Sequence, residues 1–127
     1  MKKIILLFSH TLTDVQMHDA MATFGVEVSV ALPKELQTLW SNVPAELEAL
    51  GEYLQPFNEY LKRELNRGDV VLVQGDFGAT YAMVSTVRSL GGVALYATTK
   101  RNVVEKLVNE KIVKTSIFEH VRFRVYE

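Results

Sequence analysis

The fold is decided by the stretch Val70-Val71-Leu72-Val73-Gln74-Gly75-Asp76-Phe77. Its first four residues are apolar and mostly β-branched, which is typical of a strand buried on both faces of a parallel sheet. A glycine loop follows, and Asp76 at its end predicts the N-cap of a helix from Phe77 to about Leu90. A strand that leads directly into a helix indicates an α/β protein.

The same alternation of strand and helix occurs on both sides of this stretch. Lys3–Phe8 is a second apolar run, and a capping box at Thr13 and a glycine at Gly25 bound the helix predicted after it. Val26–Leu32 and Val93–Ala97 are further runs that predict strands. We therefore expect one domain over the whole chain, with a mainly parallel sheet, helices on both faces and right-handed crossovers.

Two helical segments are predicted between the second and third strands. The first runs from Pro33 to about Trp40, and leucines at three- and four-residue spacing then extend from Leu47 to Leu65. This spacing predicts a long amphipathic helix, or two helices broken at Pro56.

The last quarter of the chain has extended character. Val103–Val108 and Ile112-Val113 flank Asn109-Glu110, a pattern that favours a hairpin over a helix. Val121–Val125 alternates apolar and basic residues, as a strand with one buried face does. We expect an antiparallel β extension after the parallel core.

Composition excludes several classes of protein. The 127 residues are 48% hydrophobic and 23% charged, which excludes a disordered chain, and the absence of cysteine excludes disulfides and thiolate metal sites. The apolar runs are much shorter than the roughly 20 residues of a membrane span. Met1-Lys2-Lys3 imitates a signal peptide, but no cleavage site follows, so we expect a cytoplasmic protein without membrane contact.

Charge is distributed unevenly along the chain. Residues 1–99 carry 7 basic and 11 acidic side chains, whereas residues 100–127 carry 7 basic and 4 acidic ones. The overall net charge of −1 argues against binding of long nucleic acids. The basic quarter predicts a site for a small anion, and the alternative is a solvated basic strand surface.

Polar residues follow three of the predicted strands, at the carboxyl ends where open α/β sheets bind ligands. They combine hydroxyls, an imidazole, an amide and two cations, a composition typical of a phosphate- or nucleotide-binding edge. Asp76 is a helix cap more readily than a base. The residues concerned are Ser9, His10, Thr11, Gln74, Gly75, Asp76, Phe77, Thr98, Thr99, Lys100 and Arg101.

Other kinds of site are disfavoured by spacing. Gly75 and Gly78 match neither the dinucleotide fingerprint nor the phosphate loop of nucleoside triphosphatases. His10 and His18 are eight residues apart, and His18 belongs to a helix with its own core stripe, so we expect no metal and no cofactor. Trp40 is expected in the core, with stacking on a base as the alternative.

Several segments together resemble the small stand-alone CRISPR-associated proteins of type III systems, which are related to CARF domains. The resemblance spans nearly the whole chain, and its more specific parts are the Ala-Thr-Thr-x-Arg and His-Val-x-Phe-Arg-x-Tyr pieces. The segments are Phe8-Ser9-His10, Leu39–Pro44, Gln74–Gly78, Tyr96–Arg101 and Phe118–Tyr126.

The resemblance implies a Rossmann-like core, a two-fold homodimer and binding of a cyclic oligoadenylate, most often cyclic tetra-adenylate. It also implies a ring nuclease, in which a ribose 2′-OH attacks the adjacent phosphate without a metal and leaves a 2′,3′-cyclic phosphate. A two-fold dimer would present each loop twice to a ring of matching symmetry. Alternatives are a sensor or sponge that holds the ring without turnover, and a flavodoxin-like module for another phosphate ligand.

The resemblance also implies roles for individual residues. Lys100 and Arg101 would stabilise phosphoryl charge, and Ser9 and His10 would hold phosphate or ribose, with His10 available for proton transfer. Gln74 and the Gly75 amide would read ribose or adenine. His120, Arg122 and Arg124 are expected near the site or at the dimer interface, all on one face of their strand.

Overall fold

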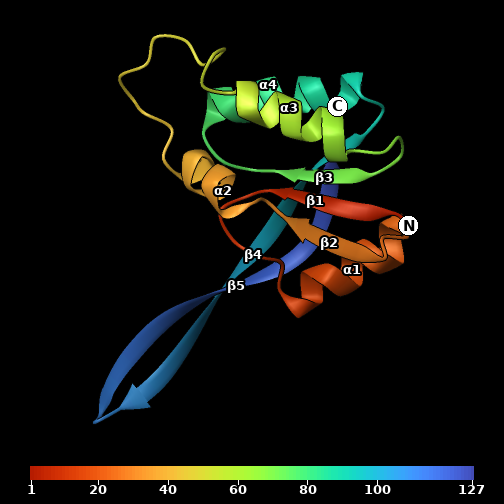
Figure 1. Cartoon of the computed structure of the whole chain (residues 1–127). Helices are drawn as coiled ribbons and strands as arrows, with labels where there is room; N and C mark the ends of the chain where they lie inside the picture. The colour runs from red at the N-terminus through yellow and green to blue at the C-terminus, as the bar shows by residue number, and fades with distance from the viewer.

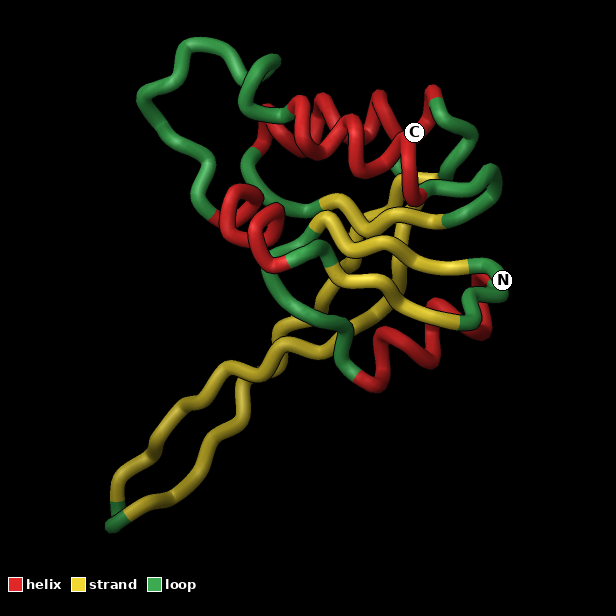
Figure 2. Tube along the Cα trace, in the orientation of Figure 1, coloured by secondary structure: helices red, strands yellow, loops and turns green.

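The computed structural model describes residues 1–127 and has nine elements of regular structure. Figure 1 shows their arrangement and Figure 2 their types. In chain order they are β1 (Lys3–Leu7), α1 (Asp14–Phe24), β2 (Val28–Ala31), α2 (Lys34–Ser41), α3 (Gln55–Glu64), β3 (Val70–Val73), α4 (Phe77–Ser89), β4 (Val93–Val108) and β5 (Lys111–Val125).

The strands form one sheet in the order β2-β1-β3-β4-β5. The first four are parallel, and β5 pairs antiparallel with β4 along its whole length. The protein is therefore an α/β protein with a mainly parallel sheet and a C-terminal antiparallel extension, as the sequence predicts.

Two apolar cores lie on opposite faces of the sheet. On one face Ala20 of α1 packs with Ile4 and Leu6 of β1, and on the other Phe57 of α3 and Met83 of α4 pack with Ile5 and Leu7. The central strands β1 and β3 are buried on both faces, so nearly every residue in them is apolar.

Local signals in the sequence fix the helix ends. Thr13 and Gln16 form the predicted capping box of α1, and Gly25 ends this helix in the left-handed conformation with φ of 69°. Asp76 caps α4, since its Oδ2 accepts a hydrogen bond from Ala79 N at 3.0 Å. These predictions are confirmed.

The long helix predicted from Leu47 to Leu65 is wrong in its first half. Residues 42–54 form turns, Leu47 is exposed, and the helix begins only at Gln55. Pro56 starts α3 rather than breaking a helix, because its missing N–H is not needed in the first turn. Leu54 is still buried in the core. The leucine spacing therefore predicted the burial of this residue correctly, but it predicted a helical conformation that the segment does not have.

The hairpin is confirmed and is much longer than expected. β4 continues without a break through Thr98–Arg101, which the sequence predicts as a loop, because each of these residues pairs with a residue of β5. Asn109 and Glu110 form the turn with φ values of 51° and 63°. Figures 1 and 2 show residues 99–120 projecting from the body as a two-stranded ribbon, called the arm below.

No helix of this chain combines the length and apolar character that crossing a bilayer requires.

Candidate functional site

The chain winds outward in opposite directions from β1 and β3, which are neighbours in the sheet. β1 leads into Ser9 and His10 and then to α1 on one face, whereas β3 leads into Gln74 and Gly75 and then to α4 on the other. This reversal is where open α/β sheets form a ligand crevice. We call the carboxyl ends of β1, β3 and the parallel part of β4 the carboxyl edge.

Helix α2 packs against the carboxyl edge and contacts both of its loops. Ser41 Oγ donates a hydrogen bond to Ser9 Oγ at 3.0 Å, and Gln37 Nε2 reaches the Ser9 main-chain oxygen at 3.5 Å. Trp40 Nε1 donates to the main-chain oxygen of Gln74 at 2.9 Å. Ser9 is thus held by α2 and does not cap α1, since Thr13 does that.

Gln74 and Gly75 have structural partners in this arrangement. The Gln74 Oε1 accepts a hydrogen bond from the Ala97 N–H and so joins β3 to β4 beyond their last ladder bond. A Cβ at Gly75 would lie 2.8 Å from Trp40 Nε1, so this glycine is required by packing of the buried indole. Trp40 is in the core as expected.

A row of aromatic side chains adjoins the carboxyl edge on the α4 face. Tyr96 and Tyr126 lie with ring centroids 4.8 Å apart, and the Tyr126 hydroxyl donates to Val73 O at 2.7 Å. Phe77, at the first position of α4, is 95% exposed. These three rings, with Gln74, Gly75, Thr80 and Ala97, line a cavity of about 460 Å³ that we call the aromatic groove.

The aromatic groove continues along α4. A neighbouring cavity of about 450 Å³ shares Phe77, Thr80 and Tyr126 with it and extends to Tyr81 and Arg88. The Thr80 Oγ1 is buried where the two cavities meet and has no hydrogen-bond partner in the protein. Burial of an unpaired hydroxyl is costly, so this atom marks an unsatisfied polar position beneath the groove.

Burial also affects the pKa of Tyr126, which lines the aromatic groove. Burial raises the pKa of Tyr126 above its ordinary value, and the neighbouring Tyr96 adds to this. The Tyr126 phenol is therefore neutral at physiological pH and donates its proton to Val73 O.

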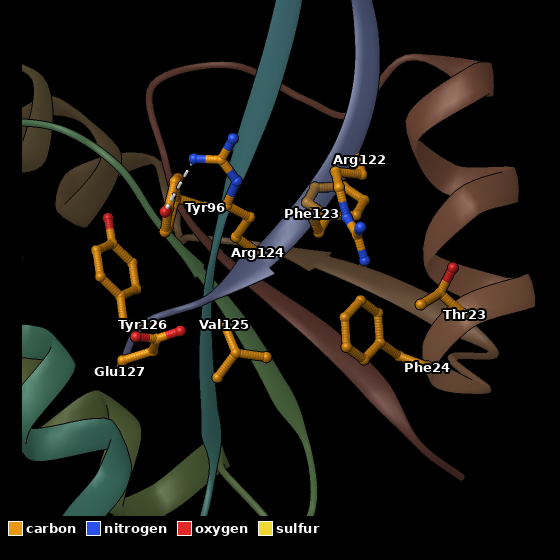
Figure 3. Close-up of a pocket in the computed structure, with 9 residues that line it drawn as sticks. All are labelled: Thr23, Phe24, Tyr96, Arg122, Phe123, Arg124, Val125, Tyr126 and Glu127. Atoms are coloured by element: carbon orange, nitrogen blue, oxygen red, sulfur yellow. Dashed lines mark hydrogen bonds between the residues drawn. The ribbon is translucent and has the colours of Figure 1, made fainter.

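Two arginines of β5 lie beside the groove. Figure 3 shows the Arg124 guanidinium beside the Tyr96 hydroxyl, whereas Arg122 extends toward α1. The Arg124 Nη1 lies 3.4 Å from Tyr96 Oη, and its Cζ is 5.8 Å from the centre of that ring. Both arginines line a cavity of about 720 Å³ that also contains Tyr96 and Tyr126. A cation is thus available next to the tilted pair of rings of Tyr96 and Tyr126.

Lys100 and Arg101 are not in a loop at the carboxyl edge. They lie in the arm, where Arg101 Nε donates to Ser116 Oγ across the hairpin at 3.1 Å, and no contact joins them to Ser9 or His10. Thr98 is also committed to the ladder, since its Oγ1 donates to Arg122 O at 2.9 Å. The loop prediction failed because polar residues on a two-sided solvated strand have no hydrophobic pattern.

His120 differs from its predicted position. A register shift between Thr98 and Thr99 leaves Val121 unpaired, so His120 turns to the α1 side with Phe123 rather than to the face of Arg122 and Arg124. Its side chain is only 5% exposed, and its Nε2 lies 2.7 Å from Asp19 Oδ2. The other ring nitrogen, Nδ1, is buried without a partner.

The contact between His120 and Asp19 also shifts the pKa of Asp19, which lies on α1. Burial acts to raise the pKa of Asp19, but hydrogen bonds from His120 and Thr23 outweigh it and lower that pKa overall. The carboxylate is therefore charged at neutral pH, and the contact attaches the base of the arm to α1.

The remaining predicted residues lie at the rim. His10 and Thr11 are exposed, and the His10 ring packs edge-on against Phe8 at 5.3 Å. Thr99 lines a separate cavity of about 440 Å³ between the start of α1 and the base of the arm. The structure thus places Ser9, Gln74, Gly75, Asp76 and Phe77 at the carboxyl edge and Thr99 and His120 at the arm base.

Comparison with known proteins gives a family. The model of the family described as "Uncharacterized protein MJ1673 family" matches residues 2–124. The chain belongs to the MJ1673 family. It is 44% identical over 126 residues to "Uncharacterized protein MJ1673" of Methanocaldococcus jannaschii, covering 99% of this chain and 98% of that protein. No solved structure matches the chain.

In this member of the MJ1673 family, the sequence-based prediction missed the aromatic part of the candidate site. Tyr96 and Tyr126 enter the prediction only as parts of the resemblance, and Tyr81 does not enter it at all, whereas Arg124 is predicted near the site or the dimer interface. A signal was present, because Tyr96 and Ala97 directly follow Leu95, the last residue of β4 that pairs with β3, and residues at that position border the carboxyl edge.

Proposed function

We propose that the protein binds a cyclic oligoadenylate at its carboxyl edge and opens the ring. Cyclic tetra-adenylate is the ring expected from the sequence resemblance. The observation that carries the proposal is the aromatic groove, where Phe77, Tyr96 and Tyr126 adjoin a cation and an unpaired buried hydroxyl at the reversal point of the sheet.

The groove has the chemistry of a base-binding site. Stacking of a nucleobase on an aromatic side chain contributes about 1–3 kcal/mol. Phe77 offers an almost fully exposed ring for this.

The cations suit a ligand with more than one phosphate. Arg124 is in contact with Tyr96. Lys100 and Arg101 follow Ala97 by three and four residues, which places them about 10–14 Å farther along the strand. A single phosphate would not reach both positions, whereas the phosphates of an oligonucleotide ring are spread over such a distance.

Opening of the ring needs positioning and charge stabilisation. In this reaction a ribose O2′ forms a bond to the adjacent phosphorus, the bond from phosphorus to O5′ breaks, and the proton of O2′ leaves as O5′ gains one. Ser9 and the exposed His10 stand at the end of β1, where they could hold the reacting ribose and exchange the proton. Cationic side chains would stabilise the phosphoryl oxygens.

Sequestration without cleavage is a second candidate, favoured by one observation. Arg101 is bonded to Ser116 within the arm and makes no contact with Ser9 or His10. The groups proposed for catalysis are thus not assembled around one point, whereas binding does not require them to be.

This function would place the protein with the CARF-like proteins of type III CRISPR systems. The strand order β2-β1-β3-β4 is the flavodoxin-like order of doubly wound sheets, and with helices on both faces it supports a Rossmann-like assignment in this broad sense. The proposal includes action in the cytoplasm and action as a homodimer.

The decisive experiment incubates the protein with labelled cyclic tetra-adenylate in the presence of EDTA. A linear product with a 2′,3′-cyclic phosphate end supports the ring nuclease. Retention of intact ring by the protein over hours supports sequestration and overturns cleavage. Absence of binding to any cyclic oligoadenylate in a calorimetric titration overturns both.

The groove is tested by substitution of its exposed ring. Phe77→Leu keeps an apolar side chain but removes the stacking surface, so we expect at least a tenfold loss of affinity for cyclic tetra-adenylate. Leu47→Ala, which changes an exposed apolar residue far along the chain, is the matched control and should bind as the wild type does. Equal affinity of the Phe77→Leu protein would show that the base binds elsewhere.

A further inference from the structure

The arm exposes apolar side chains that no part of the chain covers. Its residues pair only with one another, because the strands of the body end before it begins. A two-stranded ribbon is at best marginally stable in water without a surface to pack on. The exposed apolar residues include Val103, Leu107, Val108, Ile112, Val113, Ile117 and Phe118.

The pairing register divides these side chains between two faces. Residues directly opposite one another share a face, so one face carries the pairs Thr99–His120, Arg101–Phe118, Val103–Ser116, Glu105–Lys114 and Leu107–Ile112. We call it the inner face, because His120 on it contacts Asp19 of α1. The apolar side chains of the inner face are more exposed than those of the opposite face, with Leu107 at 75% and Ile112 at 67%.

The inner face is self-complementary about its centre. Arg101 and Glu105 lie two residues on either side of Val103 in β4, and Phe118 and Lys114 lie two residues on either side of Ser116 in β5. If two arms pack with their inner faces together and antiparallel, a two-fold axis through Val103 brings Arg101 of each against Glu105 of the other. The same axis brings each Lys114 onto the other Phe118, which is a favourable contact for a cation.

The same symmetry determines where the tip of the arm lies. Leu107 and Ile112 are four residues beyond the centre, so they face the Thr99–His120 pair of the other copy. That position is the cavity of about 440 Å³ at the base of the arm. Val15, which is 62% exposed, and Phe118, which is 67% exposed, provide its apolar walls.

We propose that the arm mediates homodimerisation, with inner face against inner face and the Leu107–Ile112 tip of each chain in the cavity at the arm base of a second copy. One inner face covers roughly 350 Å², from ten residue pairs at about 3.4 Å and a width of about 10 Å. The smallest specific interfaces bury about 600 Å² per partner. The interface must therefore include the cavity, which makes the tip its most sensitive part.

This interface does not depend on the ligand proposed above. Its readout is oligomeric state, measured by light scattering after size exclusion and by sedimentation, with circular dichroism to verify that each variant is folded. The wild type should have twice the 14.4 kDa chain mass. A wild type that stays monomeric at high micromolar concentration would overturn the proposal.

The tip variant and its control separate the two faces of the arm. Leu107→Glu buries a charge in the cavity of the second copy and should raise the dimer dissociation constant at least a hundredfold. Val113→Glu changes an exposed apolar residue in the same turn region but on the opposite face, and should leave that constant within about threefold of the wild type. Equal effects of the two, or no effect of Leu107→Glu, would contradict the assignment.

The charge pair allows a test by rescue. Arg101→Glu places two glutamates against each other across the axis, and Glu105→Arg places two arginines there, so each variant alone should be monomeric. In an equimolar mixture both contacts become attractive, and a heterodimer should form. If the mixture remains monomeric, or if each variant alone dimerises as the wild type does, the antiparallel register is wrong.

Discussion

Gly75 is constrained by a neighbouring ring rather than by its own backbone. A methyl group at this position would meet Trp40 Nε1 at 2.8 Å and two further ring atoms at 3.0 and 3.1 Å. The indole cannot easily yield, since it is buried and bonded to Gln74 O. A sequence shows the glycine but not this reason for it, because the ring comes from a helix 35 residues earlier.

We predict that Gly75→Ala lowers the free energy of unfolding by about 1–3 kcal/mol, because overpacking forces the indole from its position. Urea unfolding followed by Trp40 fluorescence measures this. Gly51→Ala is the control, since nothing lies within 4 Å of a Cβ there, and its effect should stay within about 0.5 kcal/mol. A Gly75→Ala protein as stable as the control would show that Trp40 moves freely.

Asp69 is a buried charge with several partners. Its side chain is 3% exposed and its Oδ2 lies 2.7 Å from Lys3 Nζ, while the N–H groups of Lys3 and Asn66 also donate to it. Burial acts to raise the pKa of Asp69, but these hydrogen bonds and the lysine charge outweigh burial and lower it below the ordinary 3.8. The ionised carboxylate therefore stabilises the fold.

The sign of the resulting pH dependence follows. A carboxyl whose pKa is lower in the folded state adds stability above its unfolded pKa and loses it as pH falls through the folded pKa. Asp69→Asn should cost about 3 kcal/mol at pH 7, because it leaves Lys3 half-buried without its partner charge. The difference from the wild type should shrink below pH 4. Urea titrations at pH 7 and pH 3 measure it, with the exposed Glu59→Gln as control, and a difference independent of pH would exclude this role.

At the scale of elements, the sequence predicted most of the fold from local signals. Caps at Thr13, Gly25 and Asp76 and the buried runs of β1 and β3 are all confirmed. The errors lie where tertiary partners decide conformation. Leu54 reaches the core from a turn, and Thr98–Arg101 are extended because β5 pairs with them, although their own side chains are compatible with a loop.

The candidate site was only partly predictable, for the same reason. Ser9, Gln74 and Gly75 could be placed because carboxyl ends of parallel strands share one edge. His120 could not, because the register shift beside Thr98 turns it to the other face, and a single unpaired residue leaves no mark in the sequence.

The turn of the arm contains backbone strain at Glu110, which a substitution by glycine would relieve. Asn109 and Glu110 both have positive φ, and only asparagine or glycine adopts this conformation without a cost of about 1 kcal/mol. Glu110→Gly should therefore slow hydrogen exchange at the amides of Val108 and Lys111 several-fold. Glu105→Gly, in the straight part of the same strand, should have the opposite effect. Faster exchange in the Glu110→Gly protein would mean that the turn has another conformation in solution.

At the scale of the whole molecule, dimerisation through the arm links stability to concentration. If only the folded chain dimerises, mass action raises the midpoint of thermal unfolding as protein concentration increases. We expect an increase of several degrees between 1 and 100 μM for the wild type and none for the Leu107→Glu protein. Calorimetry at these two concentrations tests this, and a midpoint independent of concentration in the wild type would show that the arms do not associate.

The dimer also changes the expected stoichiometry of the ligand. Antiparallel arms centred on Val103 hold the two carboxyl edges about 40 Å apart, because Ala97 lies six residues before Val103 in each chain and each residue adds about 3.4 Å. One ring on the two-fold axis would therefore not contact both edges. This differs from the symmetric placement that the sequence resemblance implies. Titration calorimetry should give one cyclic tetra-adenylate per chain. One ring per two chains would favour an interface between the edges instead.

Because the arm is long, the contact between His120 and Asp19 at its base controls the position of its tip. A ribbon of ten residues, about 34 Å long, is a lever whose pivot is the register shift at Thr98, so a rotation of 10° at the base moves the tip by about 6 Å. That displacement exceeds the width of the side chains at the tip. The 2.7 Å contact between His120 and Asp19 at the pivot therefore sets the direction of the arm, and a change at this contact would displace the tip from the cavity of the second copy.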